Sequence, residues 1–524
     1  MQGEWTGELV GPDVWVTCRE LIPAGSVFAF LAEHREALFP ASMFADMYPS
    51  PNGRPSMPPQ VLAAAVVLQA LLGRSDFEAV QDLRCDLRWK AACGLGLYDT
   101  AFDPSLLAYF RRRLARSARP MRIFEAVREV VHGTGVLKTR QRRALDSTVL
   151  DDAVATQDTV TQLVAAVRRV IREVPGGAQT AAAVCRAHDY ADPGKPQIAW
   201  NDEAARAELV DALVTDAVRL LAELPEQELG EAAANAVGLL ALVAGQDVEP
   251  AEDSDGRDGR WRIARRTVPD RMVSTVDPES RHVHKTRSHR QEGFKAHVAI
   301  EPETGLITAA ALTPGAGPEH HEATVALDLL ASEPGGLQIF ADTAYASDST
   351  CGTLTKAGHE LFIKPAPLKT AVVGGFSLDD FAIDTTASTV TCPAGHQVVL
   401  GEASGIHMQR RAAFTECGSC PLRQRCTKAK AGRVLTIRPN HDQQAAARHR
   451  AATDPDWQAA YRRWRPPVER VIAWITGGGN RRLRYLGTIK NDAWLNTRAA
   501  AVNLRTLINL GLHRTSEGWA LAQA

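Results

Sequence analysis

The sequence predicts a mixed α/β core that is combined with a helical N-terminal domain and two insertions. Short apolar and β-branched runs, which are typical of strands, alternate with helical patterns between residues 143 and 363. Two stretches of different character interrupt this alternation, at about 153–290 and 366–438. The chain has 524 residues, too many for one compact core, so we expect several domains or one domain with large insertions.

We expect four parts along the chain. They are an N-terminal helical domain for DNA binding or dimerisation (1–140), a mixed α/β core (141–152, 291–365 and 439–524), a mostly helical insertion with a linker near 250–260 (153–290), and a cysteine-rich insertion (366–438). In the first part, Ser75 and Glu78 form a capping box at a helix start, and Asp103-Pro104 supplies an N-cap and a proline at the first helical position.

The elements of the core follow from the spacing of apolar residues. We expect strands at 143–150, 294–300, 306–312, 337–340 and 360–363, and helices at 319–331 and 347–357. The first insertion should hold a helix from Thr159 and further helical sequence at about 203–244. Residues 454–512 are again helical, but Pro466-Pro467 should break or restart the helix.

The charge and hydropathy of the chain restrict its class. The net charge is −1, but residues 109–143 hold eleven Lys/Arg against two acids, and residues 460–490 hold eight against one. Such clusters are expected where phosphates bind, although solvated helix faces produce them too. The N-terminus lacks a signal-peptide pattern and no apolar run reaches about 18 residues, so we expect a cytoplasmic protein without membrane contact.

Carboxylates stand at two strands and one helix start. Asp146 interrupts an apolar strand, where a carboxylate is costly unless it is paired or binds a cation; a turn cap with Ser147 is the alternative. Asp342 follows a second apolar strand at its carboxyl end, where ligand sites are common, and a helix N-cap is its alternative. Glu469 lies in the first turn after the two prolines. If they meet, the three would form an all-oxygen site for two Mg²⁺ or Mn²⁺ ions.

The cysteine-rich insertion has the spacing of a metal site. Cys392, Cys417, Cys420 and Cys426 include one close C-x-x-C pair, which tetrahedral zinc sites favour. We expect a structural Zn²⁺ here, with free cysteines as the alternative and His396 or His407 as substitute ligands. Arg and Lys residues flank the cysteines, so the insertion could contact DNA; a purely structural role is the equal alternative.

Several short motifs occur in a fixed order over about 450 residues. They are Ser75-Asp76-Phe77-Glu78, Phe102-Asp103-Pro104-Ser105-Leu106, Leu145-Asp146-Ser147-Thr148, the 274–281 stretch with Lys285, Gly293-Phe294-Lys295-Ala296-His297, Ala341-Asp342-Thr343-Ala344-Tyr345, Tyr461 with Val468-Glu469-Arg470, Asn480-Arg481-Arg482 and Asn503-Leu504-Arg505. Together they resemble the DDE transposases of bacterial insertion sequences, specifically the group numbered eleven-eighty-two. Two departures are Trp464, where an arginine is common, and Thr476, where a lysine often follows the glutamate.

The resemblance implies a fold and an activity. It implies a ribonuclease-H-like core in which Asp146, Asp342 and Glu469 hold Mg²⁺ or Mn²⁺ and cut DNA to free a 3′-hydroxyl, which then attacks target DNA. Lys295, Arg465, Arg470, Arg481 and Arg482 become candidates for DNA contact, with surface salt bridges as their alternative. The implied partners are double-stranded DNA (terminal inverted repeats and target) and further copies of the chain, in a nucleoid-associated complex. The alternatives are a catalytically silent DNA-binding regulator and a nuclease without strand transfer.

Overall fold

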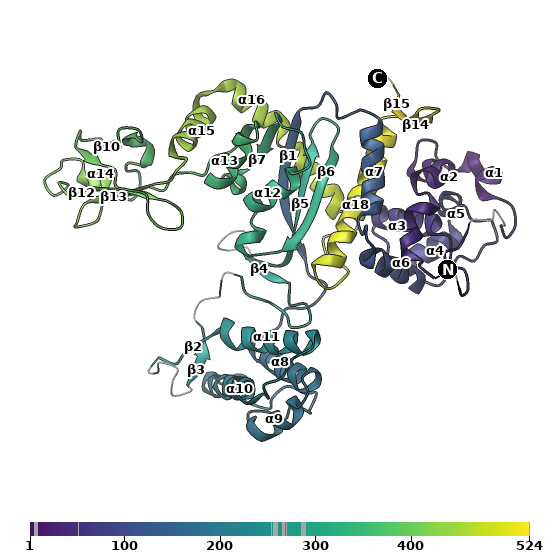
Figure 1. Cartoon of the computed structure of the whole chain (residues 1–524), viewed down its shortest axis with the longest axis horizontal. Coiled ribbons are helices and arrows are strands. Elements are labelled where there is room, and N and C mark those ends of the chain that lie inside the picture. Colours follow the sequence, from purple (N-terminus) through teal and green to yellow (C-terminus); the bar gives the residue numbers. More distant parts are fainter. Residues whose placement is uncertain are drawn as a thin grey trace.

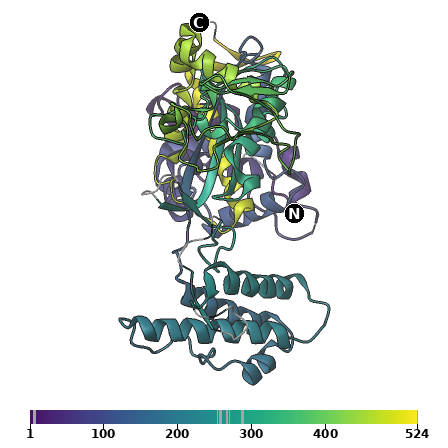
Figure 2. The ribbon, with the colours of Figure 1, turned by 90° about the vertical axis from the view of Figure 1, so that its left-hand side faces the viewer.

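The computed structural model describes residues 1–4, 9–50, 52–252, 254, 260–264, 268, 270–284 and 290–522. A central α/β body carries helices of the N-terminal region on one side and a small cysteine-containing module on the other, and a helical bundle projects below (Figure 1). A second view shows the same projecting bundle joined to the body by thin connections (Figure 2). Lys285 and most of the linker expected at 250–260 lie outside the described residues.

A six-stranded mixed sheet forms the centre of the molecule, and the predicted mixed α/β architecture is confirmed. Its strands are β1 (Arg142–Asp151), β4 (Arg281–His284), β5 (Arg290–Glu301), β6 (Leu306–Pro314), β7 (Gln338–Ala341) and β8 (Glu360–Ile363). The order is β4-β5-β1-β7-β8, with β6 paired to β5 as well. β5 runs antiparallel to β1, β4 and β6, whereas β7 and β8 run parallel to β1. β4 lies within residues 153–290, which the sequence predicts to be insertion, so the sheet begins earlier in the chain than expected.

The register of the sheet places two segments that are distant in the sequence side by side. Phe340 on β7 pairs with Ala144 on β1, and the two strands are parallel. Asp342 and Asp146 each follow two residues later, so they come side by side at the same edge of the sheet. On the other side of β1, Gly293 adopts a φ of +142° beside Leu150, where a Cβ would lie 2.2 Å from the Leu150 carbonyl oxygen. This close approach explains a glycine at the start of the Gly293–His297 motif.

The two faces of the sheet are covered by different helices. One face packs with α17 (Pro467–Thr476), α18 (Thr488–Asn509) and most of the N-terminal helices in a single large hydrophobic core. The N-terminal helices are α1 (Val14–Cys18), α2 (Val27–Leu38), α3 (Pro59–Leu72), α4 (Asp76–Cys85), α5 (Leu87–Cys93), α6 (Ser105–Arg116) and α7 (Arg122–Gly133), with 3-10 turns at Arg19–Leu21 and Ala41–Met47. The predicted capping box of Ser75 and Glu78 is present at the start of α4. The N-terminal region therefore shares its core with the sheet.

The opposite face of the sheet is covered by two shorter helices. These are α12 (Glu322–Leu330) and α13 (Asp348–Lys356), with 3-10 turns at Pro318–His320 and Thr343–Tyr345. Leu145, Ala299, Ile339 and Ala341 of the sheet pack against them in a separate cluster. Because side chains alternate along β1, Asp146 and Ser147 face opposite sides of the sheet.

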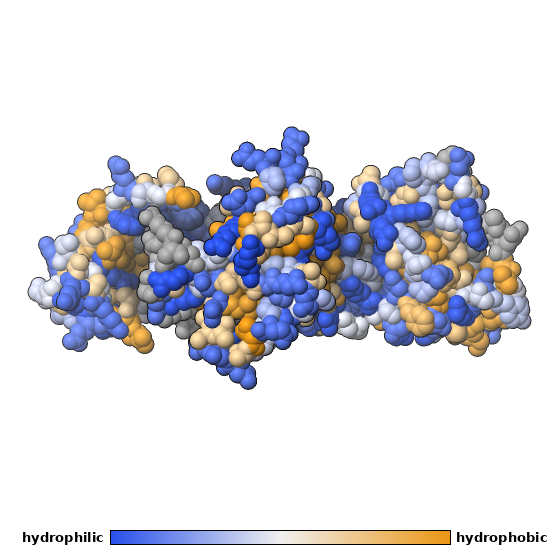
Figure 3. Space-filling view, turned by 90° about the horizontal axis from the view of Figure 1, so that it is seen from below, coloured by the Kyte–Doolittle hydropathy of each residue, from blue (hydrophilic) through white to orange (hydrophobic). Residues whose placement is uncertain are grey.

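The first insertion is an independent helical bundle. It contains α8 (Thr159–Glu173), α9 (Gly177–Val184), α10 (Glu203–Glu223), α11 (Glu231–Gln246), β2 (Val248–Pro250) and β3 (Trp261–Ile263), and it has its own hydrophobic core. Seen from below, this face of the molecule is mostly hydrophilic, with hydrophobic side chains in small scattered patches (Figure 3). Within the described ranges no single helix is long and apolar enough to cross a membrane, and one pair, α3 and α4, meets the length and composition criteria only together, across a bend of 111°.

The second insertion and the C-terminal region complete the chain. The cysteine-rich module has β9 (Ala382–Asp384), β10 (Thr389–Thr391), β11 (Gln397–Val399), β12 (Arg410–Phe414), α14 (Arg423–Cys426) and β13 (Arg433–Ile437), after a 3-10 turn at Leu378–Asp380. Then come α15 (His441–Thr453), α16 (Pro455–Trp464), α17, α18, β14 (Leu512–Thr515) and β15 (Gly518–Leu521). Asp454 caps α16 and the chain restarts its helix at Pro467, as the sequence predicts.

A buried arginine joins α17 to the N-terminal region. The guanidinium of Arg498, on α18, donates hydrogen bonds to the carbonyls of Trp474 (2.7 Å) and Ile475 (3.0 Å), near the end of α17. The same group donates to the carbonyl of Leu71 (2.6 Å), at the end of α3, and also to that of Ala70. A cation is well placed there because helix C-termini expose unpaired carbonyls and carry partial negative charge. Arg498 therefore fixes the helix that carries Glu469.

Candidate active site

Asp146 lies in the middle of β1, on the face of the sheet covered by α17. Its side chain is 14% exposed, and one carboxylate oxygen accepts a hydrogen bond from the Ser147 amide at 2.9 Å. Burial, opposed by the charge of Arg465, raises the pKa of Asp146 to about 6. The strand continues to Asp151, so Asp146 does not cap a turn. A buried carboxylate inside a strand calls for a cation beside it.

Asp342 lies directly after β7, at its carboxyl end. Its carboxylate accepts a hydrogen bond from the Ala344 amide at 2.9 Å and caps the 3-10 turn Thr343–Tyr345. The N-cap is therefore present, and it uses one carboxylate oxygen and leaves the other directed toward Arg465. Its side chain is 43% exposed, so this carboxylate lies at the opening of the site.

Glu469 comes from the first turn of α17, immediately after the two prolines. Pro466 has helical dihedral angles, and Val468 and Val471 are fully buried against the sheet. The glutamate side chain is 66% exposed, on the side of α17 that faces Arg465. The helix restart thus sets where the third carboxylate stands.

Arg465 brings the three carboxylates together. Its Nη2 lies 3.0 Å from Oδ2 of Asp146 and 3.8 Å from Oδ2 of Asp342, and its Nη1 lies 2.5 Å from Oε1 of Glu469. The arginine side chain is only 9% exposed. Burial alone would lower the pKa of Arg465, but the charges of Asp146, Asp342 and Glu469 raise it above its ordinary value. Three acids from segments far apart in the sequence therefore surround one buried cation.

The three carboxylates are suitable ligands for a divalent metal ion, but in this structure they are not spaced to hold one. Three carboxylates are the ligands that Mg²⁺ and Mn²⁺ prefer. In this conformation the Arg465 guanidinium occupies the space between them. Among the residues that the structure describes, no group of three or more His, Cys, Asp or Glu side chains is arranged to hold a metal ion. The three carboxylates attract a positive charge, and in this structure the Arg465 guanidinium supplies it.

A second polar cluster lies on the opposite face of β1. Lys295 on β5 forms an ion pair with Glu322 on α12 at 2.8 Å, and both side chains are mostly buried. Ser147 donates a hydrogen bond to the same glutamate at 3.2 Å. His297 is fully buried beside them, its Nε2 lies 3.0 Å from the Thr313 hydroxyl, and burial lowers its pKa to about 4.

Glu322 was not recognised from the sequence. The run Glu319-His320-His321-Glu322 has the composition of a polar helix start, and α12 does begin at Glu322. The signal that could have found it is the lysine of the Gly293–His297 motif, since a lysine pointing into the core needs an acid from the element that covers it. Lys295 is thus engaged within the fold.

Trp464 is held between two arginines next to Arg465. The guanidinium of Arg142 lies 4.4 Å from the centre of the indole ring, and that of Arg463 lies 4.3 Å from it. The ring also packs at the margin of the large hydrophobic core. Arg142 is itself fixed by Glu303 at 2.6 Å. Trp464 therefore links the end of α16 to the start of β1.

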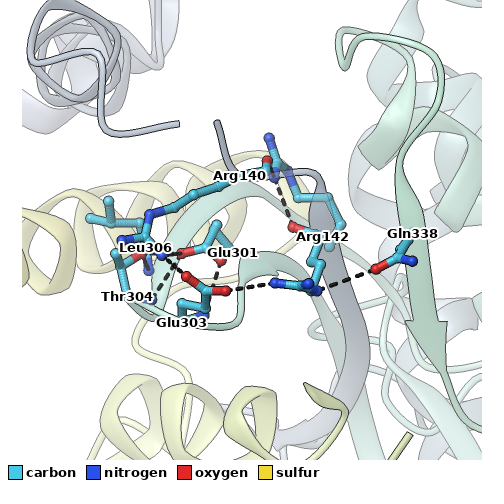
Figure 4. A network of polar contacts seen from close by, with 8 residues as sticks. Arg140, Arg142, Glu301, Glu303, Thr304, Leu306 and Gln338 are labelled. Atoms are coloured by element: carbon cyan, nitrogen blue, oxygen red, sulfur yellow. Dashed lines mark hydrogen bonds and ion pairs between the residues drawn. The ribbon is translucent and has the colours of Figure 1, made fainter. Parts of the chain in front are cut away.

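The network that fixes Arg142 closes the turn between β5 and β6 (Figure 4). Glu301 is fully buried and accepts hydrogen bonds from the amides of Glu303 (3.0 Å) and Thr304 (2.8 Å). Glu303 pairs with Arg140 and Arg142. The start of β1 is thereby fixed four residues before Asp146.

The remaining candidates for DNA contact lie on the surface around the site. Arg470 is exposed on α17, next to Glu469. Arg481 and Arg482 are exposed as well, and their guanidinium groups donate to the carbonyls of Val149 (3.3 Å) and Ala153 (3.0 Å), beside the end of β1.

The four clustered cysteines line one cavity in the second insertion. Cys392, Cys417, Cys420 and Cys426 surround a space of about 370 Å³ together with His396. Burial and the neighbouring thiols raise the pKa of Cys426, while Arg433 opposes this. His407 does not line this cavity. The fold brings the four thiols together around one cavity. Among the described residues, however, no group of three or more His, Cys, Asp or Glu side chains has the spacing that a metal ion requires.

Two parts of the chain match known protein families. Residues 391–508 match the family model described as "Transposase DDE domain", and residues 16–113 match "Transposase domain (DUF772)". The first range includes Arg465, Glu469 and the four clustered cysteines, whereas Asp146 and Asp342 lie outside both ranges. No curated protein and no solved structure gives a match to this chain. The two family matches, one at each end of the fold, support the assignment of this chain as a DDE transposase.

Proposed function

We propose that the protein is a DDE transposase of the insertion-sequence group numbered eleven-eighty-two, which cuts DNA at transposon ends and joins the freed end to target DNA. The observation that carries the proposal is the convergence of Asp146, Asp342 and Glu469 on one buried cation, Arg465. The three acids are separated from one another by more than a hundred residues of sequence, and their meeting at one place supports a shared role.

The arrangement of the core supports the same proposal. β1, β7 and β8 are parallel, β5 is antiparallel to β1, and β6, antiparallel to β5, returns to the direction of β1. We propose that this five-strand unit is the ribonuclease-H-like core implied by the motifs. Asp146 on the central strand and Asp342 at the end of its parallel neighbour then occupy the site edge, and α17 supplies the third acid.

The roles of the residues follow from their chemistry. When bound, two Mg²⁺ or Mn²⁺ ions held by the three carboxylates would activate the attacking oxygen and stabilise the leaving oxygen of an in-line phosphoryl displacement. Arg470, Arg481 and Arg482 are exposed around the site and would orient the phosphates of DNA. Arg465 would keep the carboxylates gathered before DNA and metal arrive.

The test is cleavage and strand transfer on labelled duplexes taken from the DNA that flanks the gene, with Mg²⁺ or Mn²⁺. The wild type is compared with Asp146→Asn, Asp342→Asn and Glu469→Gln, which keep the shape of each side chain and remove its charge. Asp328→Asn is the matched control, because Asp328 is an exposed acid on α12 of the same core. We expect the three site variants to bind DNA but to lose cleavage by at least about a hundredfold.

Each alternative function predicts a different result. If the wild type binds DNA but never cuts it with either metal, the protein is a silent DNA-binding regulator. If it cuts but joins no 3′ end to a second duplex, it is a nuclease without strand transfer. If the three variants cut as well as the wild type, the carboxylates are not catalytic and the proposal is wrong.

We also propose that Cys392, Cys417, Cys420 and Cys426 hold a structural Zn²⁺, for which their shared cavity is the support. The zinc content of the purified protein, measured by mass spectrometry, should be about one ion per chain and should fall to near zero in Cys417→Ser/Cys420→Ser. Cys18→Ser/Cys85→Ser is the control, because these two cysteines lie in the N-terminal region. Equal zinc content in both double variants would refute the site.

A further inference from the structure

A groove lies between the N-terminal region and the start of α18. One wall is α6, and the other is formed by residues 485–490 and the first turns of α18. The groove has a volume of about 480 Å³, and its lining includes Arg112, Arg116, Leu486, Ile489, Lys490 and Trp494. We call it the α6–α18 groove. Nothing in the roles assigned above uses it.

The walls of the groove are fixed by charged hydrogen bonds that do not involve its exposed cations. Arg111 on α6 pairs with Asp76 at 2.5 Å and donates to Gln69 at 3.0 Å, which ties α6 to α3 and α4. Arg484 donates to the carbonyl of Gly73 at 2.6 Å and so ties the other wall to the end of α3. The groove is therefore preformed.

The cations that face solvent in the groove are available for a ligand. Arg112, Arg116 and Lys490 are exposed, and none of the three forms an ion pair with a described acid. The Arg112 guanidinium lies 5.3 Å from the centre of the Tyr109 ring. The acid in the lining, Glu279, is engaged elsewhere, since its carboxylate accepts hydrogen bonds from the Thr488 amide at 2.7 Å and from the Thr488 hydroxyl. Glu279 lies at the N-terminus of α18, where a negative charge is favourable, and the three exposed cations outnumber it in the lining.

Apolar side chains accompany these cations. Ile489 is 70% exposed and Leu486 is 44% exposed, although large hydrophobic residues usually avoid water. An apolar strip bordered by lysine and arginine matches a nucleic acid, in which sugars and base edges alternate with phosphates. It matches an acidic protein less well, because a protein would need carboxylates at the spacing of all three cations.

The groove is connected to the candidate active site through β1. The Asp151 amide donates to the Arg481 carbonyl at 2.9 Å, and the Leu483 amide donates to the Asp151 carbonyl at 2.8 Å, so residues 481–483 run along the end of β1. Asp146 lies five residues before Asp151, which corresponds to roughly 17 Å of extended strand.

We propose that the α6–α18 groove contacts the backbone of a DNA duplex, with phosphates on Arg112, Arg116 and Lys490. The inference rests on the proposed function and adds to it the place where the DNA lies. It also gives the N-terminal helices a share in DNA binding, because α6 and α18 belong to one common core.

The test measures DNA affinity by fluorescence anisotropy over a series of salt concentrations. The full-length protein is titrated onto a labelled 30-base-pair duplex from the end of the flanking DNA. Arg112→Gln/Arg116→Gln/Lys490→Gln is compared with Arg206→Gln/Arg219→Gln/Lys356→Gln, which removes the same charge from exposed positions outside the groove. A variant with Arg112→Lys/Arg116→Lys keeps the charge. Melting temperatures check that every variant is folded.

We expect the groove variant to bind DNA about ten- to a hundredfold more weakly and to lower the slope of log Kd against log salt by about 2.7, the value for three phosphate contacts. The control and the lysine variant should bind like the wild type. Equal affinity and slope in the groove variant would overturn the inference while wild-type cleavage still supported the proposed function. A change in oligomeric mass without a change in DNA affinity would overturn it as well, and failure of the wild type to bind duplex DNA would overturn both.

Discussion

Arg465 and Asp146 form a buried ion pair, with Nη2 and Oδ2 3.0 Å apart, although Arg465 lies at the end of α16 and Asp146 lies on β1, far apart in the sequence. The pair is the centre of the site, because Asp342 and Glu469 approach the same guanidinium. Removing one partner of a buried pair usually leaves an uncompensated charge, and here it would leave three carboxylates facing one another.

Arg465→Gln should therefore weaken the metal-free protein and strengthen metal binding. Without the guanidinium the carboxylates repel one another, so the melting temperature in EDTA should fall by several degrees. Added Mn²⁺ should raise the melting temperature of the variant more than that of the wild type, because the ion no longer competes with an internal cation. Thermal unfolding with EDTA or Mn²⁺ measures both effects, and Arg462→Gln, on the exposed side of α16, is the control. Equal Mn²⁺ shifts in all three proteins would contradict the competition.

Arg498→Met should destabilise the fold and disturb Glu469. The substitution keeps the apolar stem but removes hydrogen bonds to the buried carbonyls of Leu71, Trp474 and Ile475, each of which costs about 1–3 kcal/mol when unsatisfied. We expect the free energy of unfolding to fall by about 3–5 kcal/mol, measured by urea denaturation. Arg505→Met on the same helix, where the guanidinium lies over the Trp474 ring, should cost far less. A loss below that of the control would show that Arg498 does not join the helices.

Lys295 and Glu322 should behave as a coupled pair. Lys295→Met leaves the mostly buried Glu322 unpaired and should lower the free energy of unfolding by about 3–5 kcal/mol. Lys295→Met/Glu322→Gln should recover much of that loss, and a double-mutant cycle measures the coupling. DNA affinity distinguishes the two roles of Lys295. If the double variant is stable but binds DNA several-fold more weakly, the lysine contacts phosphate and the structural explanation is insufficient.

Asp492 should make stability depend on pH. Burial, opposed by the hydrogen bond from the Leu312 amide at 2.8 Å, raises its pKa to about 6. Because the folded pKa lies above the unfolded value, the folded protein binds the extra proton between about pH 4 and 6, and this group's contribution to stability declines as pH rises through that window. Asp492→Asn can still accept the Leu312 hydrogen bond without carrying charge, so it should raise the melting temperature at pH 8 more than at pH 4.5. An equal change at both pH values would contradict this assignment, and the exposed Asp456→Asn is the control.

The sequence predicted the core well where one local signal decided the outcome. The structure contains the predicted strand at 360–363, the capping box of Ser75 and the helix restart after Pro466-Pro467. Each depends on a signal that acts over a few residues: the spacing of hydrophobic residues, a side-chain cap, or the missing N–H of proline. The family motifs likewise indicated Asp146, Asp342 and Glu469 as a set. Local signals could not indicate β4 as a member of the sheet, because four residues at an edge carry too little pattern.

Other features depended on contacts between distant segments. The capping role of Arg498 toward α3 and α17, the pairing of Lys295 with Glu322 and the position of Trp464 between two arginines each join elements that no local pattern connects. The common core of the N-terminal helices and the sheet is of the same kind, since an apolar helix stripe does not specify which surface will cover it.

By itself the sequence determined which residues bear charge, where most strands and helices of the central sheet lie, and which carboxylates stand at strand and helix ends, because backbone propensity and side-chain spacing are local properties. The tertiary structure alone decided that these carboxylates meet at Arg465, and that Lys295 turns to Glu322 on the other face of β1. The reason is physical: buried charges must find partners, and which partner lies within about 3 Å is fixed by sheet register and helix packing across hundreds of residues.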